Sequence, residues 1–500
     1  MRNLSKSKLL AFHQCHKRLW LAVHRPELVV ESAQSKANFR AGNEVGEIAR
    51  RLYDPAGKGA LVDAHTEGFE QAFARTQALL SSTQPVFEAG FRVEGTLAFA
   101  DVMLPVGTPE KPAWRMVEVK SSGSVKDYHH NDIAIQAFVA REAGVPLTGI
   151  ALAHVDTKWT YQGDGVYKGL LKESDLTAVA FARHAEVKTW IGEAQTIVAK
   201  TAEPTIRIGR HCSEPFECGF WTYCHSQEPQ AKHPVAWLPK VATNALKAFV
   251  ADDAVMELRQ VPDELLNTVQ LRVKQHTLAG MTYFDSRGAA KDLAPYKLPA
   301  IFLDFETVML AVPIWKGTHP YQQIPFQFSA HTLSRTGTLS QRHFLDLSGQ
   351  DPSLHFAEAL VGACGTNEPV FVYFAGFETA RIKELAERFP ALRRRLLGIN
   401  ARVVDLLPIA RERYYHPMQK GRWSIKQILP AIAPDLSYDA LDGVQDGGLA
   451  MEAYQEAIAA ETTPQRKAQI ERQLLAYCRL DTYAMVRLWG FFTGRTVPQD

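Results

Sequence analysis

The sequence lacks several features that would place it in a functional class at once. It has no excess of charge of either sign, because 56 Lys and Arg residues stand against 54 Asp and Glu residues. A basic field over the whole chain is therefore excluded, and any binding of nucleic acid must depend on local patches. No apolar run is long enough to span a membrane, and the first residues lack the apolar core of a signal peptide. These absences predict a cytoplasmic protein without a membrane partner.

Cysteine is also scarce. Six cysteines in 500 residues are too few for a disulfide scaffold, so metal binding or simple burial is expected of them. The hydrophobic fraction of 46% and the charged fraction of 22% are ordinary for a globular protein. A chain of this length exceeds what one core usually supports, and we expect two or three domains.

What the chain does contain is a strand-like stretch, residues 301–307, in which two carboxylates alternate with apolar residues. In a strand, Asp304 and Glu306 project from the same face and place their oxygens side by side. Such a pair suits Mg²⁺ or Mn²⁺, which prefer carboxylate oxygens and leave positions open for water and phosphate. Most pairs of this kind are solvated strand faces, so a metal site requires partners elsewhere in the chain.

A second group of polar residues belongs to two strands predicted over residues 91–101 and 114–120. Glu118 and Lys120 share one face of the later strand, and Asp101 ends the earlier one. Two carboxylates and an ammonium group at one edge of a sheet can hold a metal and stabilise phosphate charge. A surface strand with an ion pair is an equally good interpretation of these residues alone.

These segments, followed by a helix that carries Gln136, resemble the PD-(D/E)XK nuclease core of the RecB type. The resemblance covers much of the first two hundred residues. It implies that Asp101 and Glu118 hold a metal and that Lys120 and Gln136 complete the catalytic set.

The early helix departs from that pattern. Many relatives have a histidine where this chain has Gly46, and Glu44 and Glu47 lie close by. A carboxylate of this helix is a candidate substitute ligand.

The cysteines form a pattern of one plus three. Cys15 lies in a helix predicted to begin after Ser5, and three more follow at equal spacing far along the chain: Cys212, Cys218 and Cys224. This pattern looks like the iron-sulfur RecB-family nucleases, such as the AddB type and the CRISPR-associated exonucleases. The resemblance implies a 4Fe-4S cluster that ties distant ends of the domain together. A four-cysteine zinc site is the alternative. Cys364 and Cys478 fit neither group, and we expect both in the core.

The last two hundred residues contain further acids next to predicted strands and helices. Glu378 opens a helix after the buried strand 369–373, and Asp405 follows another apolar stretch. Tyr477 and Asp481 lie four positions apart and so share one helix face. Coincidence explains most such pairs when they are taken singly.

Taken together, these segments resemble the DnaQ-like exonucleases of RNase H fold, with four acids and a tyrosine. They are most similar to a bacterial family of unknown function that fuses this domain to a RecB-like one. The resemblance implies metal binding by the four acids Asp304, Glu306, Glu378 and Asp481, and a water-orienting role for Tyr477. Relatives usually have aspartate at the position of Glu378, so Asp405 is a second candidate there.

The sequence therefore predicts an α/β protein of two nuclease domains joined by a helical bridge. The expected boundaries are 1–228 for the RecB-like domain, 229–297 for the bridge, and 298–500 for a DnaQ-like 3′–5′ exonuclease domain. The expected function is metal-dependent hydrolysis of DNA, with single-stranded ends as the substrate, in repair or phage defence. The alternatives are a nucleic-acid-binding adaptor with one or both sites idle, favoured by the departures at Gly46 and Glu378, and an exonuclease that acts on RNA.

Overall fold

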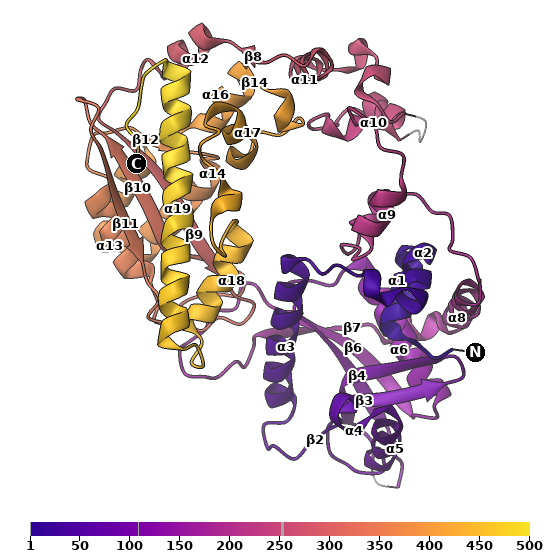
Figure 1. The fold of residues 1–500 in the computed structure, drawn as a ribbon. Coiled ribbons are helices and arrows are strands. Elements are labelled where there is room, and N and C mark those ends of the chain that lie inside the picture. The colour runs from indigo at the N-terminus through magenta and orange to yellow at the C-terminus, as the bar shows by residue number, and fades with distance from the viewer. Residues whose placement is uncertain (1, 109, 252–254) are drawn as a thin grey trace. The chain divides into compact units, whose positions relative to one another are not determined.

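The computed structural model describes residues 2–108, 110–251 and 255–500, which form a mixed α/β structure (Figure 1). The chain divides into two compact units, and each is described by itself. The first unit comprises Met1–Glu228 together with Leu310–Gln322, and the second comprises Pro229–Met309 together with Gln323–Asp500. Within the described residues, none of the helices combines the length and apolar character that crossing a bilayer requires.

The first unit is built on a seven-stranded sheet of order β2-β3-β4-β5-β6-β7, in which β1 pairs with β4 beside this path. Strands β3, β4 and β5 are antiparallel neighbours, and β5 runs parallel to β6. The strands are β1 (Leu4–Ser5), β2 (Ala60–Leu61), β3 (Val86–Val93), β4 (Thr96–Pro105), β5 (Trp114–Lys120), β6 (Leu147–Val155) and β7 (Leu171–Asp175). The helices are α1 (Lys6–Gln14), α2 (His16–His24), α3 (Ala33–Tyr53), α4 (Ala64–Glu67), α5 (Phe69–Leu79), α6 (Asp127–Glu142), α7 (Thr177–Ala182), α8 (His184–Val198) and α9 (Trp221–Gln227).

Two local predictions for this unit are wrong. The strand predicted over 91–101 is split by a turn at Gly95, whose positive φ of 83° suits glycine, so Asp101 lies in the middle of β4 and not at a strand end. The helix predicted after Ser5 stops at Gln14, because Cys15 is extended, with φ −166° and ψ 124°. Cys15 therefore lies between α1 and α2 and not inside a helix.

The second unit contains a five-stranded sheet of order β11-β10-β9-β12-β13, with β9 at its centre. β9 pairs antiparallel with β10 and parallel with β12. The sheet strands are β9 (Ala300–Met309), β10 (Gln323–Leu333), β11 (Leu339–Leu345), β12 (Val370–Val372) and β13 (Val403–Asp405). Its helices are α13 (Ser353–Ala363), α14 (Gly376–Arg388), α15 (Arg393–Asn400), α16 (Leu406–Arg413), α17 (Ile425–Ile432), α18 (Gly447–Ile458) and α19 (Pro464–Thr493). The long helix α19 contacts β9 and β10, as Figure 1 shows.

The bridge, residues 229–297, belongs to the second unit, and its described part combines helices with irregular segments. They form α10 (Asn244–Val250), α11 (Thr268–Ala279) and α12 (Ser286–Leu293), and β8 (Tyr283–Phe284) pairs with β14 (Tyr414–Tyr415). The Asn267 side chain caps α11, and Gly280 ends it in the left-handed conformation.

The connection between β9 and β10, residues 310–322, is part of the first unit. Ala311 and Val312 are buried against an apolar cluster that includes Val45, Ile48 and Val155. The hydroxyl of Tyr321 donates a hydrogen bond to the backbone carbonyl of Ser121, directly after β5. Nothing in the sequence pattern marks this segment as part of the first core, because its contacts with that core are remote in the chain.

We expect the substitution Val312→Asp to destabilise the first unit by on the order of 3 kcal/mol, because it places an unpaired carboxylate in an apolar cluster. Val312 is 7% exposed, whereas Val166 of the same unit is 55% exposed. Val166→Asp is therefore the matched control and should leave stability nearly unchanged. Thermal unfolding, with hydrogen exchange of β6 as a local readout, checks this. Equal stability of the two variants would contradict the packing described.

Candidate functional site

The first group of functional side chains lies on the face of the second sheet that contacts α19. Asp304 and Glu306 project from β9, and Cys478 of α19 lies beside them. Among the described residues, these three form the only group of potential metal ligands whose ligand atoms all lie within 4.8 Å of one another. Cys478 is buried, as predicted, and its Sγ lies 3.9 Å from Oδ2 of Asp304.

Asp481 of α19 is a third carboxylate that acts electrostatically on Asp304 and Glu306, and it is held by two tyrosines. The hydroxyl of Tyr438, in a short 3₁₀ turn, donates a hydrogen bond to Oδ1 of Asp481 at 2.5 Å, and Tyr477 bonds the same carboxylate. Nζ of Lys426, on α17, lies 4.9 Å from the ring centroid of Tyr438 and 5.0 Å from that of Tyr477. The predicted pair Tyr477 and Asp481 thus meets the β9 acids.

The electrostatics of this cluster are dominated by burial. Burial, followed by repulsion from Asp481, raises the pKa of Asp304 and of Glu306 well above the usual range. Burial also raises the pKa of Asp481 to about 6, against the opposing effects of Tyr438 and Lys426. Because like charges in a dry site are costly, such a cluster keeps protons until a cation compensates it.

Glu378 is the fourth acid, and Asp405, its alternative, has another role. Asp405 accepts hydrogen bonds from the backbone N–H groups of Phe374, Ala375 and Leu407, at 3.0, 3.0 and 2.9 Å. It therefore fixes the turn that opens α14. Glu378, in the first turn of α14, is 2% exposed, and within the described residues its Oε2 has no hydrogen-bond partner. Burial raises its pKa to about 8, and it acts electrostatically on Asp304.

The second site lies in the first unit, where Glu118 and Lys120 of β5 meet α6. Nζ of Lys120 lies 2.6 Å from Oε1 of Glu118, and Nε2 of Gln136 donates to the other oxygen of Glu118. Asp101 of β4 accepts a hydrogen bond of 2.6 Å from the backbone N–H of Val119. The four predicted residues are thus brought together, with Glu118 and Gln136 fully buried.

Two further residues complete this site and were missed from the sequence. Asp132 precedes Gln136 by one turn of α6 and lies 2.6 Å from Nζ of Lys120. Nζ of Lys6, at the start of α1, lies 2.7 Å from Glu118 and 3.0 Å from Asp132. The i, i+4 spacing of Asp132 and Gln136 was a usable signal. Lys6 gave none, because it reaches the site from more than a hundred residues away.

Charge in this second site is balanced internally. Burial opposes the ionisation of Glu118 and Asp132, but Lys120 and Lys6 outweigh it and hold both pKa values below the usual range. Asp101 differs, because burial and then repulsion from Glu118 raise its pKa well above the usual range. Of the three carboxyls, Asp101 is therefore the one expected to hold a proton.

A cavity of about 560 Å³ opens onto these residues, and α3 forms part of its wall. Gly46 and Glu47 of α3 line it, together with Glu88 of β3, so Glu47 and not Glu44 is the α3 carboxylate at this cavity. Glu88 has a positive φ of 54° and lies near Glu118, which helps to raise its pKa after burial. It is a further acid that the sequence did not indicate.

The four predicted cysteines come together at one small cavity of the first unit. Cys15, Cys212, Cys218 and Cys224 line it, with Lys17 and Arg18 of α2 beside them. Nε2 of Gln14 donates to the carbonyls of His211 and Phe216, which ties α1 to the cysteine loop. Burial, which Lys17 opposes, raises the pKa of Cys224 to about 11.

Comparison with known proteins matches one region of the chain to a protein family. A family model described as a domain of unknown function (DUF2779) matches residues 301–424, the stretch that contains Asp304, Glu306 and Glu378. No curated protein matches the chain.

We expect the protein without metal to lose stability as the pH rises through neutrality. The carboxyl of Glu378 has a folded pKa of about 8 against 4.5 unfolded, so its contribution is fully present below 4.5 and is lost as the pH approaches 8. For Glu378 alone, the free energy of unfolding falls by about 4–5 kcal/mol over this pH range.

Melting temperatures measured from pH 4.5 to pH 8 in EDTA check this. Glu378→Gln should flatten the profile, and added Mg²⁺ or Mn²⁺ should restore stability at the high-pH end. A profile that rises toward pH 8 without metal would show that these acids are solvated.

Proposed function

We propose that the protein is a divalent-metal-dependent nuclease that hydrolyses phosphodiester bonds of DNA, with single-stranded ends as its substrate. The observation that carries this proposal is the acid cluster on β9 and α19. Glu306 and Asp481 are buried and Asp304 is partly buried, all three have raised pKa values, and Glu378 adds a buried oxygen that lacks a partner among the described residues. Carboxylates arranged in this way suit hard divalent cations.

The two sheets support the resemblances on which the proposal rests. A mixed five-stranded sheet whose central strand carries two acids, with a C-terminal helix across it, is compatible with a DnaQ-like domain of RNase H fold. The mixed sheet of the first unit, with Glu118 and Lys120 on β5 and Gln136 on α6, is compatible with a PD-(D/E)XK core.

In this proposal the β9 acids hold Mg²⁺ or Mn²⁺, and Asp481 and Glu378 complete the ligand set. The bound ions would supply a hydroxide nucleophile and stabilise the leaving 3′ oxygen. Burial raises the pKa of Tyr477 far above the usual range, so its phenol remains protonated and can orient the attacking water. Lys426 adds a positive charge that offsets the phosphate.

The first unit has two possible roles. As a second nuclease site it would use Asp101 and Glu118 for metal and Lys120 for phosphate charge. A binding role without catalysis is the alternative, because Glu118 is already engaged by Lys6, Lys120 and Gln136. Two wider alternatives to a DNA nuclease are a nucleic-acid-binding adaptor in which both sites are inactive, and a nuclease whose substrate is RNA.

The four cysteines are proposed to bind a 4Fe-4S cluster. Four thiols from both ends of the unit, with Lys17 and Arg18 beside them, fit an anionic cluster with four thiolate ligands. A single zinc ion held by the same four cysteines is the alternative. When bound, the cluster would supply a structural link between α2 and the cysteine loop.

Degradation of end-labelled single-stranded DNA with Mg²⁺ or Mn²⁺ tests the nuclease proposal. Asp304→Ala should reduce the activity of the second unit by at least about 10²-fold, because it removes a metal ligand. Glu471→Gln changes an exposed carboxylate of the same helix that carries Asp481, and should have no effect.

Lys120→Ala and the double variant separate the two units. Loss of a distinct part of the activity in each single variant is expected if both sites are catalytic. Activity that depends on Asp304 alone would make the first unit a binding module. If the wild type binds DNA but never degrades it, the nuclease proposal is overturned in favour of an adaptor. If it degrades a matched RNA faster than the DNA, the proposed substrate becomes RNA.

Cys212→Ala should remove the visible absorption of the purified protein and its bound iron, and should lower the melting temperature. Cys364→Ala is the control, because Cys364 is buried in the second unit. Analysis of iron and acid-labile sulfide checks this. Stoichiometric zinc in place of iron would contradict the cluster assignment.

A further inference from the structure

The second unit contains a cavity of about 590 Å³ lined by three basic side chains from three separate segments: Lys240 before α10, Arg411 of α16, and Arg422 of the turn before α17. Asn267, Thr268 and Trp423 also line it, and no carboxylate does. We propose that this cavity, called the Arg411 pocket below, binds a backbone phosphate of single-stranded nucleic acid beyond the nucleotide held at the β9 acids. The inference rests on the proposed nuclease function and assigns a further binding site to it.

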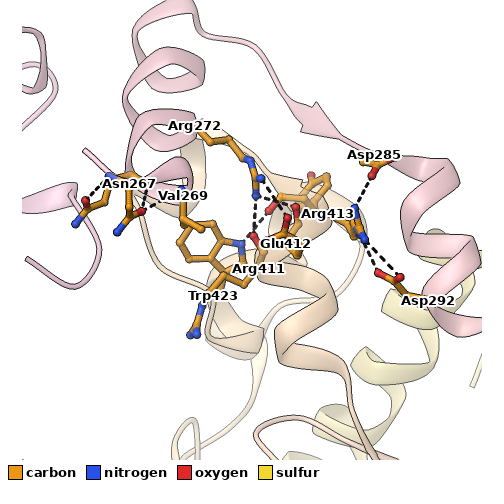
Figure 2. A network of polar contacts seen from close by, with 11 residues as sticks. Asn267, Val269, Arg272, Asp285, Asp292, Arg411, Glu412, Arg413 and Trp423 are labelled. Atoms are coloured by element: carbon orange, nitrogen blue, oxygen red, sulfur yellow. Dashed lines mark hydrogen bonds and ion pairs between the residues drawn. The ribbon is translucent and has the colours of Figure 1, made fainter. Parts of the chain in front are cut away.

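The charges in the Arg411 pocket lack compensation. In the described part of the chain, the side chains of Lys240, Arg411 and Arg422 have neither an ion pair nor a hydrogen bond. A neighbouring arginine shows the contrast. The guanidinium of Arg413 lies 2.8 Å from carboxylate oxygens of both Asp285 and Asp292 (Figure 2). Arg413 is thus neutralised where it ties α16 to α12, whereas the three cations that line the cavity have no carboxylate partner in the described part of the chain.

Partly buried hydrogen bonds hold the walls of the pocket in place. Nε2 of Gln270 donates to the carbonyls of Pro239 and Lys240 at 2.8 and 3.2 Å. Nη1 of Arg272 donates to the carbonyls of Arg411 and Glu412 at 3.0 and 2.7 Å, as Figure 2 shows. These bonds tie α11 of the bridge to the 239–240 turn and to α16. The backbone segments that carry Lys240 and Arg411 are therefore held in place before any ligand arrives, which reduces part of the entropic cost of binding.

The chain links this pocket directly to the acid cluster. Trp423 lines the pocket, and three residues later Lys426 acts electrostatically on Asp304 and Glu306. The hydroxyl of Tyr373, at the end of β12, donates to the carbonyl of Trp423 at 2.5 Å and fixes this segment. A strand whose end reaches the acids would thus meet uncompensated positive charge next to the site. Backbone phosphates are the anions that such a path would recognise.

Binding of long single-stranded DNA, measured by fluorescence anisotropy without divalent metal, tests the Arg411 pocket. The double variant Arg411→Gln with Arg422→Gln should lower the affinity about tenfold at low salt. It should also flatten the dependence of log K on log salt, by about 0.7 for each phosphate that the pocket no longer neutralises. The matched control is Arg394→Gln with Arg395→Gln, which removes the same charge from exposed positions of α15.

The proposal is supported if the pocket variant alone flattens the salt dependence. Equal effects in the pocket and control variants, or an unchanged slope in both, would overturn it while leaving the nuclease proposal in place. Loss of binding for a free nucleotide but not for the polymer would overturn the assignment to a strand backbone. Wild type that binds no single strand would overturn both proposals. If the double variant proves unstable, Lys240→Gln replaces it, because the side chain of Lys240 is exposed. This variant should flatten the salt dependence in part.

Discussion

The burial of like charges around β9 is the constraint on which the second unit depends. Asp304 and Glu306 project from the central strand, and Asp481 approaches from α19; Glu306 and Asp481 are buried, and Asp304 is partly buried. Two tyrosine hydroxyls and the nearby Lys426 offset only part of the repulsion between the carboxylates and of the cost of burying them, so the carboxyls retain protons. A fold that keeps such an arrangement gains from a ligand of high positive charge, and the pKa values and the proposed metal binding are two aspects of that one requirement.

In the first unit, lysines compensate the buried carboxylates. Its carboxylates, Glu118 and Asp132, are matched by Lys6 and Lys120 within hydrogen-bond distance, and both remain ionised. A metal entering this site would have to displace a lysine or the proton of Asp101, whereas at the β9 site it would replace protons alone. The two candidate sites are therefore expected to differ in metal affinity and in pH dependence, even if both act on the same polymer.

The sequence alone predicted the features that depend on residues close together in the chain. The alternation around Asp304, the spacing of Tyr477 and Asp481, and the α/β class all follow from short-range periodicity. The residues that it missed reach their sites from distant segments. Lys6 meets β5 across more than a hundred residues, and Tyr438 approaches Asp481 from an irregular turn. The same holds for the 310–322 segment, whose place in the first core depends on remote contacts alone.

The measurement that tests the central claim most directly is the release of protons when Mn²⁺ binds, followed by calorimetry in buffers of different ionisation enthalpy near neutral pH. The account predicts that Mn²⁺ displaces protons from the acids around β9, and that Asp304→Asn lowers both the affinity and the number of protons released. Mn²⁺ binding without proton release, or binding that Asp304→Asn leaves unchanged, would contradict the claim that the acids around β9 form the metal site.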